Sequence, residues 1–196
     1  MRLSKKIFAA SALTVTLATA VAPNALATSK NGEDNTPEQC AAASAAVANG
    51  QPLPDLPLFR QGHGALDGNT LTLFDDSQRY SDVIKAAAQS WEDSTNGQIK
   101  VNVVDHQTTD SVRLYDTNQD TTWVGWTRKD PWRIELNTRY LEGMSPQDQQ
   151  ATIAHEIGHT MGMKHSCPFT VMHSVSDWQQ SVTPTALDVA ALLQKD

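Results

Sequence analysis

Hydrophobic and polar residues alternate along the chain from about Asn69 onward, and this alternation predicts strands. Thr70 to Phe74 alternates between polar and apolar residues, the pattern of a strand with one buried face. Four more segments are predicted as strands on similar grounds: Ile99 to Val104, Ser111 to Tyr115, Thr121 to Arg128 and Trp132 to Thr138. The proline of Lys129-Asp130-Pro131 indicates a turn between the last two.

Apolar residues at helical spacing predict helices between and after these strands. Tyr80 to Thr95 carries an apolar stripe that we expect to pack on the sheet: Val83, Ile84, Ala87, Ala88 and Trp91. Ser145-Pro146 predicts the start of a second helix, because serine is a favoured N-cap and proline suits the first helical position. That helix should reach about Met161, and a final helix is predicted from Pro184 to Gln194, capped by Thr183.

This order of elements predicts an α+β domain, with a twisted sheet on one side and the helix that ends near Met161 beneath it. We place the domain at residues 68–196. The preceding residues 28–67 are rich in Ala, Asn, Pro and Gly and contain one predicted helix, Pro37 to Val47. They are interpreted either as a propeptide or as an N-terminal arm of the domain.

The first 27 residues have the pattern of a secretory signal peptide. Arg2, Lys5 and Lys6 precede an apolar run that ends near Ala22, and Ala25-Leu26-Ala27 forms a small-x-small cleavage site. An N-terminal anchor helix is the alternative, but the run is short and rich in Thr and Ser for a membrane span. We therefore expect a secreted, extracellular protein that has no membrane contact after processing.

Charge and cysteine content narrow the function further. The formal net charge is −7, and removal of the three basic residues of the signal peptide would change it to −10. A nucleic-acid partner is disfavoured, because phosphate binding needs a basic surface. Cys40 and Cys167 are the two cysteines. In an oxidising compartment they are expected to form a disulfide; the alternative is that the Cys40 thiolate caps a metal and keeps a precursor inactive.

Residues 155 to 165 read H-E-I-G-H-T-M-G-M-K-H and carry the strongest chemical signal. His155 and His159 are four residues apart, so on a helix they share one face and can hold two corners of a zinc site. Glu156 lies where it can act as general base. Gly162 permits a sharp turn that would return His165 as the third ligand. Three protein ligands leave a fourth position open, which is typical of catalytic zinc, whereas a helix with solvent-facing histidines would need all these residues to coincide by chance.

With Met172 downstream, this segment resembles the metzincin clan of zinc endopeptidases, most closely the small secreted snapalysin group and next the matrixins. The resemblance covers roughly Thr70 to Leu193 and is specific around the motif. It implies a metzincin-type catalytic domain: a mixed sheet whose antiparallel edge strand flanks the cleft, an active-site helix and a C-terminal helix. By position, His155, His159 and His165 match the ligands, Glu156 the general base and Met172 the residue of the Met-turn beneath the metal.

The chain departs from these and other metzincin families at four points. Snapalysins usually have Asp as third ligand, where this chain has His165, although imidazole suits zinc equally well. Ser174 stands where astacins and serralysins have a tyrosine, so no tyrosine would serve as a switchable fifth ligand. The second cysteine that snapalysins use for a local disulfide after the motif is missing, and the matrixin switch sequence is absent around Cys40.

The predicted function is a secreted, monomeric zinc metalloendopeptidase acting on protein or peptide substrates, which we expect to lie extended along an edge at Thr121 to Arg128. The alternatives are a zinc-dependent cell-wall amidase and a non-catalytic secreted binding module that keeps the metal for structure. Glu156 argues against the second of these. Storage of metal fits an open three-ligand site poorly.

Further residues have two interpretations each. His173 could be another ligand or a substrate contact, or an exposed loop histidine. Trp123, Trp126 and Trp132 could line a subsite, although Trp123 and Trp132 are expected in the core or in a strand pair. Asp116 to Asp120 resembles half of a calcium loop, but Thr121 and Thr127 replace the Gly and Glu of an EF-hand; it is either a solvated turn or a looser structural Ca²⁺ site.

Overall fold

The computed structural model describes residues 35–174 and 180–195, so the predicted signal peptide lies outside the described residues. The strands are β1 (Thr70–Asp75), β2 (Lys100–Val104), β3 (Val112–Thr117), β4 (Gly125–Arg128) and β5 (Arg133–Asn137). The helices are α1 (Pro37–Ala48), α2 (Ser81–Ser94), α3 (Thr138–Leu141), α4 (Pro146–Thr160) and α5 (Ala186–Leu193), with a short 3₁₀ helix, η1, at Leu56–Leu58.

The five strands form one mixed sheet in the order β2-β1-β3-β5-β4. Its first four strands are parallel, and β4 alone runs antiparallel, paired with β5 from Gly125↔Leu136 to Arg128↔Arg133. The predicted mixed sheet is therefore present, as a mixed α/β arrangement that is mostly parallel. This arrangement is compatible with a metzincin-type domain, and it leaves β4 at an edge.

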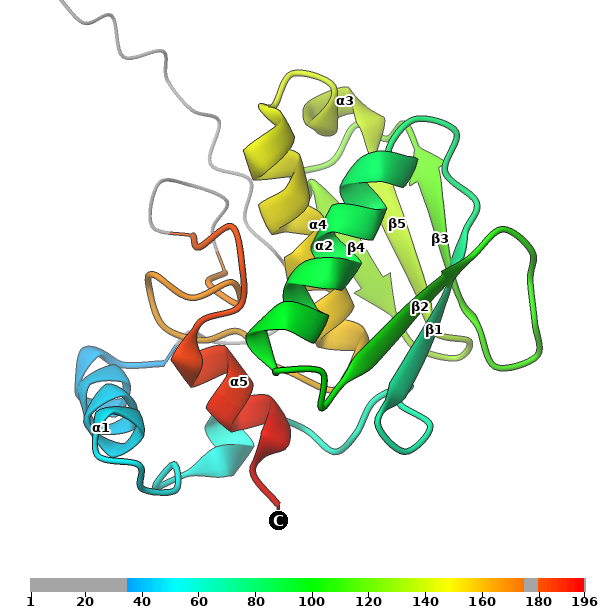
Figure 1. Ribbon diagram of the computed structural model, residues 1–196. Helices are drawn as coiled ribbons and strands as arrows, with labels where there is room; N and C mark the ends of the chain where they lie inside the picture. The colour runs from blue at the N-terminus through cyan, green and yellow to red at the C-terminus, as the bar shows by residue number, and fades with distance from the viewer. Residues whose placement is uncertain (1–34, 175–179, 196) are drawn as a thin grey trace, which may run out of the picture.

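Helices α2 and α4 lie side by side on one face of this sheet (Figure 1). Strand residues with alternate spacing point into the interface and are fully buried, including Leu71 and Leu73 of β1 and Ile134 and Leu136 of β5. The indole Nε1 of Trp91 on α2 donates a hydrogen bond to the carbonyl of Ala154 on α4, at 2.9 Å. The core thus holds the second half of α4, which carries the motif, at a fixed place beneath the sheet.

Helix α4 begins and ends as its sequence predicts. The Ser145 hydroxyl accepts a hydrogen bond from the Asp148 backbone N–H, and Pro146 occupies the first turn. At the other end Gly162 has φ +90°, a conformation that favours glycine. A Cβ on Gly162 would also lie only 2.6 Å from the carbonyl oxygen of Gly62. The sharp turn after the helix therefore requires glycine for two reasons: the positive φ, and the close approach of the Gly62 carbonyl.

Residues 35–67 pack into the same core as the rest of the chain. Ala43, Leu53, Leu56 and Phe59 are buried members of that core, and α1 packs against α5 (Figure 1). Cys40 on α1 is bonded to Cys167, 127 residues further along the chain. A propeptide and an arm could both pack in this way, so the choice between them and the boundaries at residues 28, 67 and 68 stay predictions.

Two predicted features differ in the structure, and two short helices are additional to the prediction. The strand expected from Thr121 begins at Gly125, because the Asn137 side chain holds residues 119–123 as a loop, through Gln119, Thr121 and Trp123. The last helix begins at Ala186 with Thr185 as N-cap, so the predicted cap at Thr183 is wrong. The short helices α3 and η1 were not predicted.

None of the described helices combines the length and the apolar character that crossing a membrane requires.

Candidate metal centre

Three histidines converge at the end of α4. His155 and His159 lie one turn apart on the same helix face, and His165 comes from the segment that follows the Gly162 turn. One nitrogen from each ring lies within 4.8 Å of the others, and all three side chains are buried. Within residues 35–174 and 180–195, no other group of three His, Cys, Asp or Glu residues is placed to hold a metal ion.

Backbone carbonyls fix the orientation of two of these rings. The Nδ1 of His155 lies 2.9 Å from the carbonyl oxygen of Val171, and the Nδ1 of His159 lies 2.9 Å from that of Met163. A carbonyl can only accept, so each Nδ1 carries the proton and each Nε2 presents a lone pair. Both Nε2 atoms are buried, and neither has a hydrogen-bond partner among the described residues.

The same surroundings keep these imidazoles neutral. Burial, together with the neighbouring histidines, holds the pKa of His155 well below its usual value. Burial, the His165 ring and Lys129 lower the pKa of His159 to about 3. A neutral imidazole with an unpartnered, buried Nε2 is the form that binds a metal ion, and three nitrogen donors suit Zn²⁺. The residues present therefore fit a zinc ion.

Glu156 occupies the position beside the first ligand and faces the edge strand. The Thr127 hydroxyl on β4 lies 2.7 Å from Oε2 of Glu156 and 2.9 Å from its backbone carbonyl oxygen. A Cβ on Gly125 would lie 2.7 Å from Cγ of Glu156, so glycine is needed where β4 passes the carboxylate. Burial raises the pKa of Glu156 to about 7, against the opposing effect of the Thr127 hydrogen bonds.

Met172 lies against helix α4, in a loop that a buried carboxylate stabilises. Its side chain is fully buried, and its sulfur contacts α4 at Gly158, where a Cβ would clash with it. The Ser166 N–H donates to the Met172 carbonyl at 2.8 Å, which closes the loop. The buried carboxylate of Asp188 on α5 accepts from the N–H groups of Val171 (3.0 Å) and Met172 (3.4 Å). Because Val171 also accepts from His155, Asp188 orients that ligand through the loop.

Comparison with solved structures gives a weak structural likeness. The solved structure of myroilysin is similar to this chain with a TM-score of 0.40 and 19% sequence identity. The match covers 51% of this chain and 50% of the myroilysin chain, so the chain spans about half the length of that protein. Protein-family models give no match, and neither do the curated proteins. The function proposed below therefore rests on the residues of the site.

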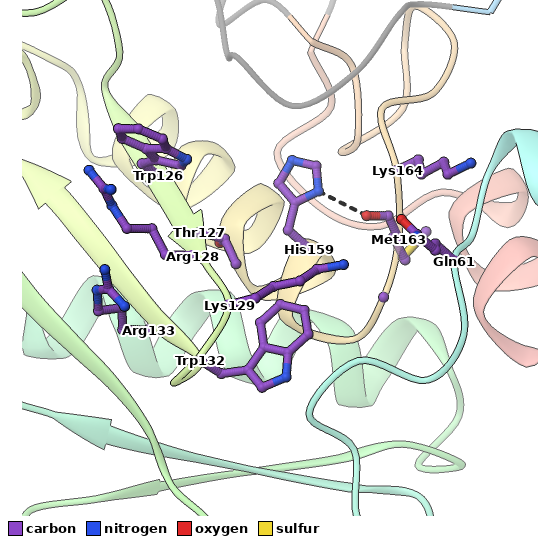
Figure 2. Close-up of a pocket in the computed structure, with 11 residues that line it drawn as sticks. Gln61, Trp126, Thr127, Arg128, Lys129, Trp132, Arg133, His159, Met163 and Lys164 are labelled. Carbon is purple, nitrogen blue, oxygen red and sulfur yellow. Dashed lines mark hydrogen bonds between the residues drawn. The ribbon is translucent and has the colours of Figure 1, made fainter.

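A cavity of about 540 Å³ opens beside His159 (Figure 2). Trp126, Thr127 and Arg128 of the edge strand line it, together with the turn after that strand and the segment that follows α4. Figure 2 shows Lys129 reaching across the cavity between His159 and Trp132. A groove beside a candidate metal site and along a free strand edge can hold an extended chain.

The structure brings the predicted site residues together. His155, His159 and His165 form the cluster, Glu156 follows His155 on the same helix, and Met172 is buried against Gly158 of that helix. Cys40 and Cys167 form a disulfide with an S–S distance of 2.05 Å, so the Cys40 sulfur is not available as a metal-capping thiolate in this structure.

Two other residues, His173 and Trp132, are placed differently from the expectation. His173 is buried, 8% exposed, where an exposed loop histidine was expected. Trp123 is buried as expected, whereas half-buried Trp132 lines the cavity. The Asp116 carboxylate accepts hydrogen bonds from Ser77 and Gln78, so it stabilises a turn, and the calcium interpretation stays a prediction.

Two supporting residues were missed from the sequence. Asp188 could have been found, because Thr185 and Asp188 have the spacing of a capping box, and the carboxylate does accept from the Thr185 N–H at 2.8 Å. Thr127 gave no such signal, since its contact with Glu156 joins residues 29 apart in sequence.

Proposed function

We propose that the chain is a secreted zinc-dependent endopeptidase that hydrolyses peptide bonds in proteins or peptides, with Glu156 as general base. One observation carries the proposal: three buried imidazoles converge beside a buried carboxylate, next to a free strand edge. His155, His159 and His165 would hold the zinc ion. Such an ion supplies Lewis acidity and makes a water molecule acidic enough to act as a nucleophile near neutral pH.

Glu156 performs the proton transfers in this proposal. Its carboxylate takes a proton from the attacking water as the water oxygen bonds to the scissile carbonyl carbon, and returns the proton to the amine nitrogen as the C–N bond breaks. Thr127 orients the carboxylate for both transfers, because its hydroxyl can donate either to Oε2 or to the Glu156 carbonyl. When the carboxyl is protonated, Oε2 can donate to the Thr127 oxygen instead.

Strand β4 is the substrate-binding edge in this proposal. It pairs with β5 on one side only, so its other side can pair with an extended peptide through main-chain hydrogen bonds. Gly125 brings this strand against Glu156, which would place the backbone of a bound peptide close to the candidate metal site. Main-chain pairing of this kind suits a protein or peptide substrate.

We further propose that residues 35–67 remain in the mature enzyme as an arm. Gln61 donates its backbone N–H to the carbonyl of Gly162 at 2.7 Å, Ala65 donates to that of Thr160 at 2.6 Å, and Lys164 donates to that of Phe59 at 2.8 Å. These hydrogen bonds stabilise the turn that precedes His165. The disulfide fits an oxidising compartment. The negative net charge disfavours a nucleic-acid partner. We also propose that the protein is a monomer without membrane contact.

Casein digestion tests the proposal. Full-length protein, secreted and processed by its host, is expected to digest casein, to lose this activity with a zinc chelator and to regain it with added zinc. Hydrolysis of cell-wall peptidoglycan with casein untouched would instead support an amidase. Zinc binding without hydrolysis of either substrate would support a binding module.

A further inference from the structure

Among the described residues, four basic side chains and no acidic one line the cavity beside His159, although the chain as a whole is acidic. The four are Arg128, Lys129, Arg133 and Lys164. Such a local excess of positive charge in a protein of net charge −7 favours negatively charged groups at this place.

Two of the four basic residues share one carboxylate, which compensates one of their two positive charges. The Nε of Arg128 lies 2.9 Å from Oε1 of Glu135, and the Nε of Arg133 lies 3.3 Å from the same oxygen. The guanidinium of Arg128 also stacks on Trp126, 3.6 Å from the ring centre. These arginines form a paired cluster on the side of the cavity away from Lys164 (Figure 2).

The two lysines keep their charge available. Lys129 forms no ion pair within residues 35–174 and 180–195, and its ammonium lies 5.3 Å from the centre of the Trp132 ring. Its side chain lies between His159 and Trp132 (Figure 2). Lys164 lies on the opposite side of the cavity, where its ammonium donates to the carbonyl of Pro57, which carries no compensating charge (Figure 2).

We propose that this cavity is a subsite for an acidic side chain, Asp or Glu, next to the scissile bond. This inference rests on the proposed function. The carboxylate of such a side chain would pair with Lys129, while its methylene groups pack on Trp132 and Met163. A cationic substrate side chain would meet uncompensated positive charge in the same place.

Internally quenched peptides with Glu, Gln, Phe or Lys at each of the two positions flanking the cleaved bond test the inference. At one of these positions, kcat/KM is expected to be about fivefold higher for Glu than for Gln, since Lys129 is exposed and its ion pair is partly screened. Lys129→Met should bring this ratio close to one. The Lys129→Glu variant should cleave the peptide with Lys at that position faster than the peptide with Glu. Lys85→Met, an exposed lysine on α2, is the matched control and should keep the wild-type ratio.

Binding gives a second readout that needs no turnover. Zinc-loaded Glu156→Gln protein should bind the Glu peptide about fivefold more tightly than the Gln peptide by titration calorimetry, and Lys129→Met should abolish the difference. Peptides that are cleaved with equal kcat/KM for Glu, Gln and Phe at both positions would overturn the subsite and leave the endopeptidase intact. If no peptide is cleaved with zinc present, both proposals fall.

Discussion

The Thr127 hydroxyl lies 2.7 Å from Oε2 of Glu156, and this contact joins the edge strand β4 to helix α4, which carries two of the three clustered histidines. Both side chains are buried, so the hydroxyl is the polar neighbour that orients the carboxylate. The contact thus ties the proposed substrate-binding strand β4 to the proposed general base.

Thr127→Val should therefore lower kcat by about 10- to 100-fold, because a hydrogen bond to a charged group contributes ~1.5–3 kcal/mol. KM and zinc content should stay close to the wild-type values. Thr127→Ser restores the hydroxyl and is expected to recover most of the activity. A Thr127→Val protein with unchanged kcat would show that the hydroxyl does not orient Glu156.

Glu156→Gln should keep the fold and the zinc but lose turnover. Glutamine has nearly the same shape, yet it cannot take a proton from water, and general-base catalysis contributes about 10²–10⁴-fold. The measurement is kcat on a peptide substrate alongside zinc content per chain. An active Glu156→Gln protein would contradict the role given to this residue.

Asp188→Asn should loosen the loop that contains Met172. The carboxylate accepts from Val171, Met172 and Thr185, whereas an asparagine side chain would turn donors toward some of these N–H groups. The free energy of unfolding should fall by about 1–3 kcal/mol, measured by urea denaturation. Zinc affinity should fall as well, because Val171 also orients His155; Asp148→Asn, at the exposed start of α4, is the control.

Removal of the disulfide should destabilise the fold and the metal centre together. The bond closes a loop across a sequence separation of 127 residues, so a Cys40→Ala, Cys167→Ala double variant should lose about 2–5 kcal/mol of stability. The wild-type protein, alkylated without reduction, should show no modified cysteine by mass spectrometry. Two alkylated cysteines in active protein would refute the pairing.

The sequence was most informative where local signals agreed with one another. Helix α4 combined a serine N-cap, a first-turn proline and a motif with helical spacing, and its start was predicted at the correct residue. Strand β1 and helix α2 followed from periodicity alone, because each buries one face against the same core.

What could not be predicted depends on contacts between distant residues. Residues 121–124 have the composition of a strand, yet the Asn137 side chain holds part of this segment as a loop. The burial of His173 follows from the packing of the loop around Met172, and the place of Trp132 in the cavity follows from the turn between β4 and β5. None of these contacts has a fixed sequence spacing.

The metal content of purified, processed protein tests the central claim most directly. Elemental analysis after dialysis against micromolar zinc should find one zinc ion per wild-type chain, and one per chain for His63→Ala, which changes an exposed histidine. His165→Ala, which removes a donor from the cluster, should retain much less than one zinc per chain. Folded wild-type protein that contains no zinc, or a His165→Ala variant that binds zinc as tightly as wild type, would contradict the account.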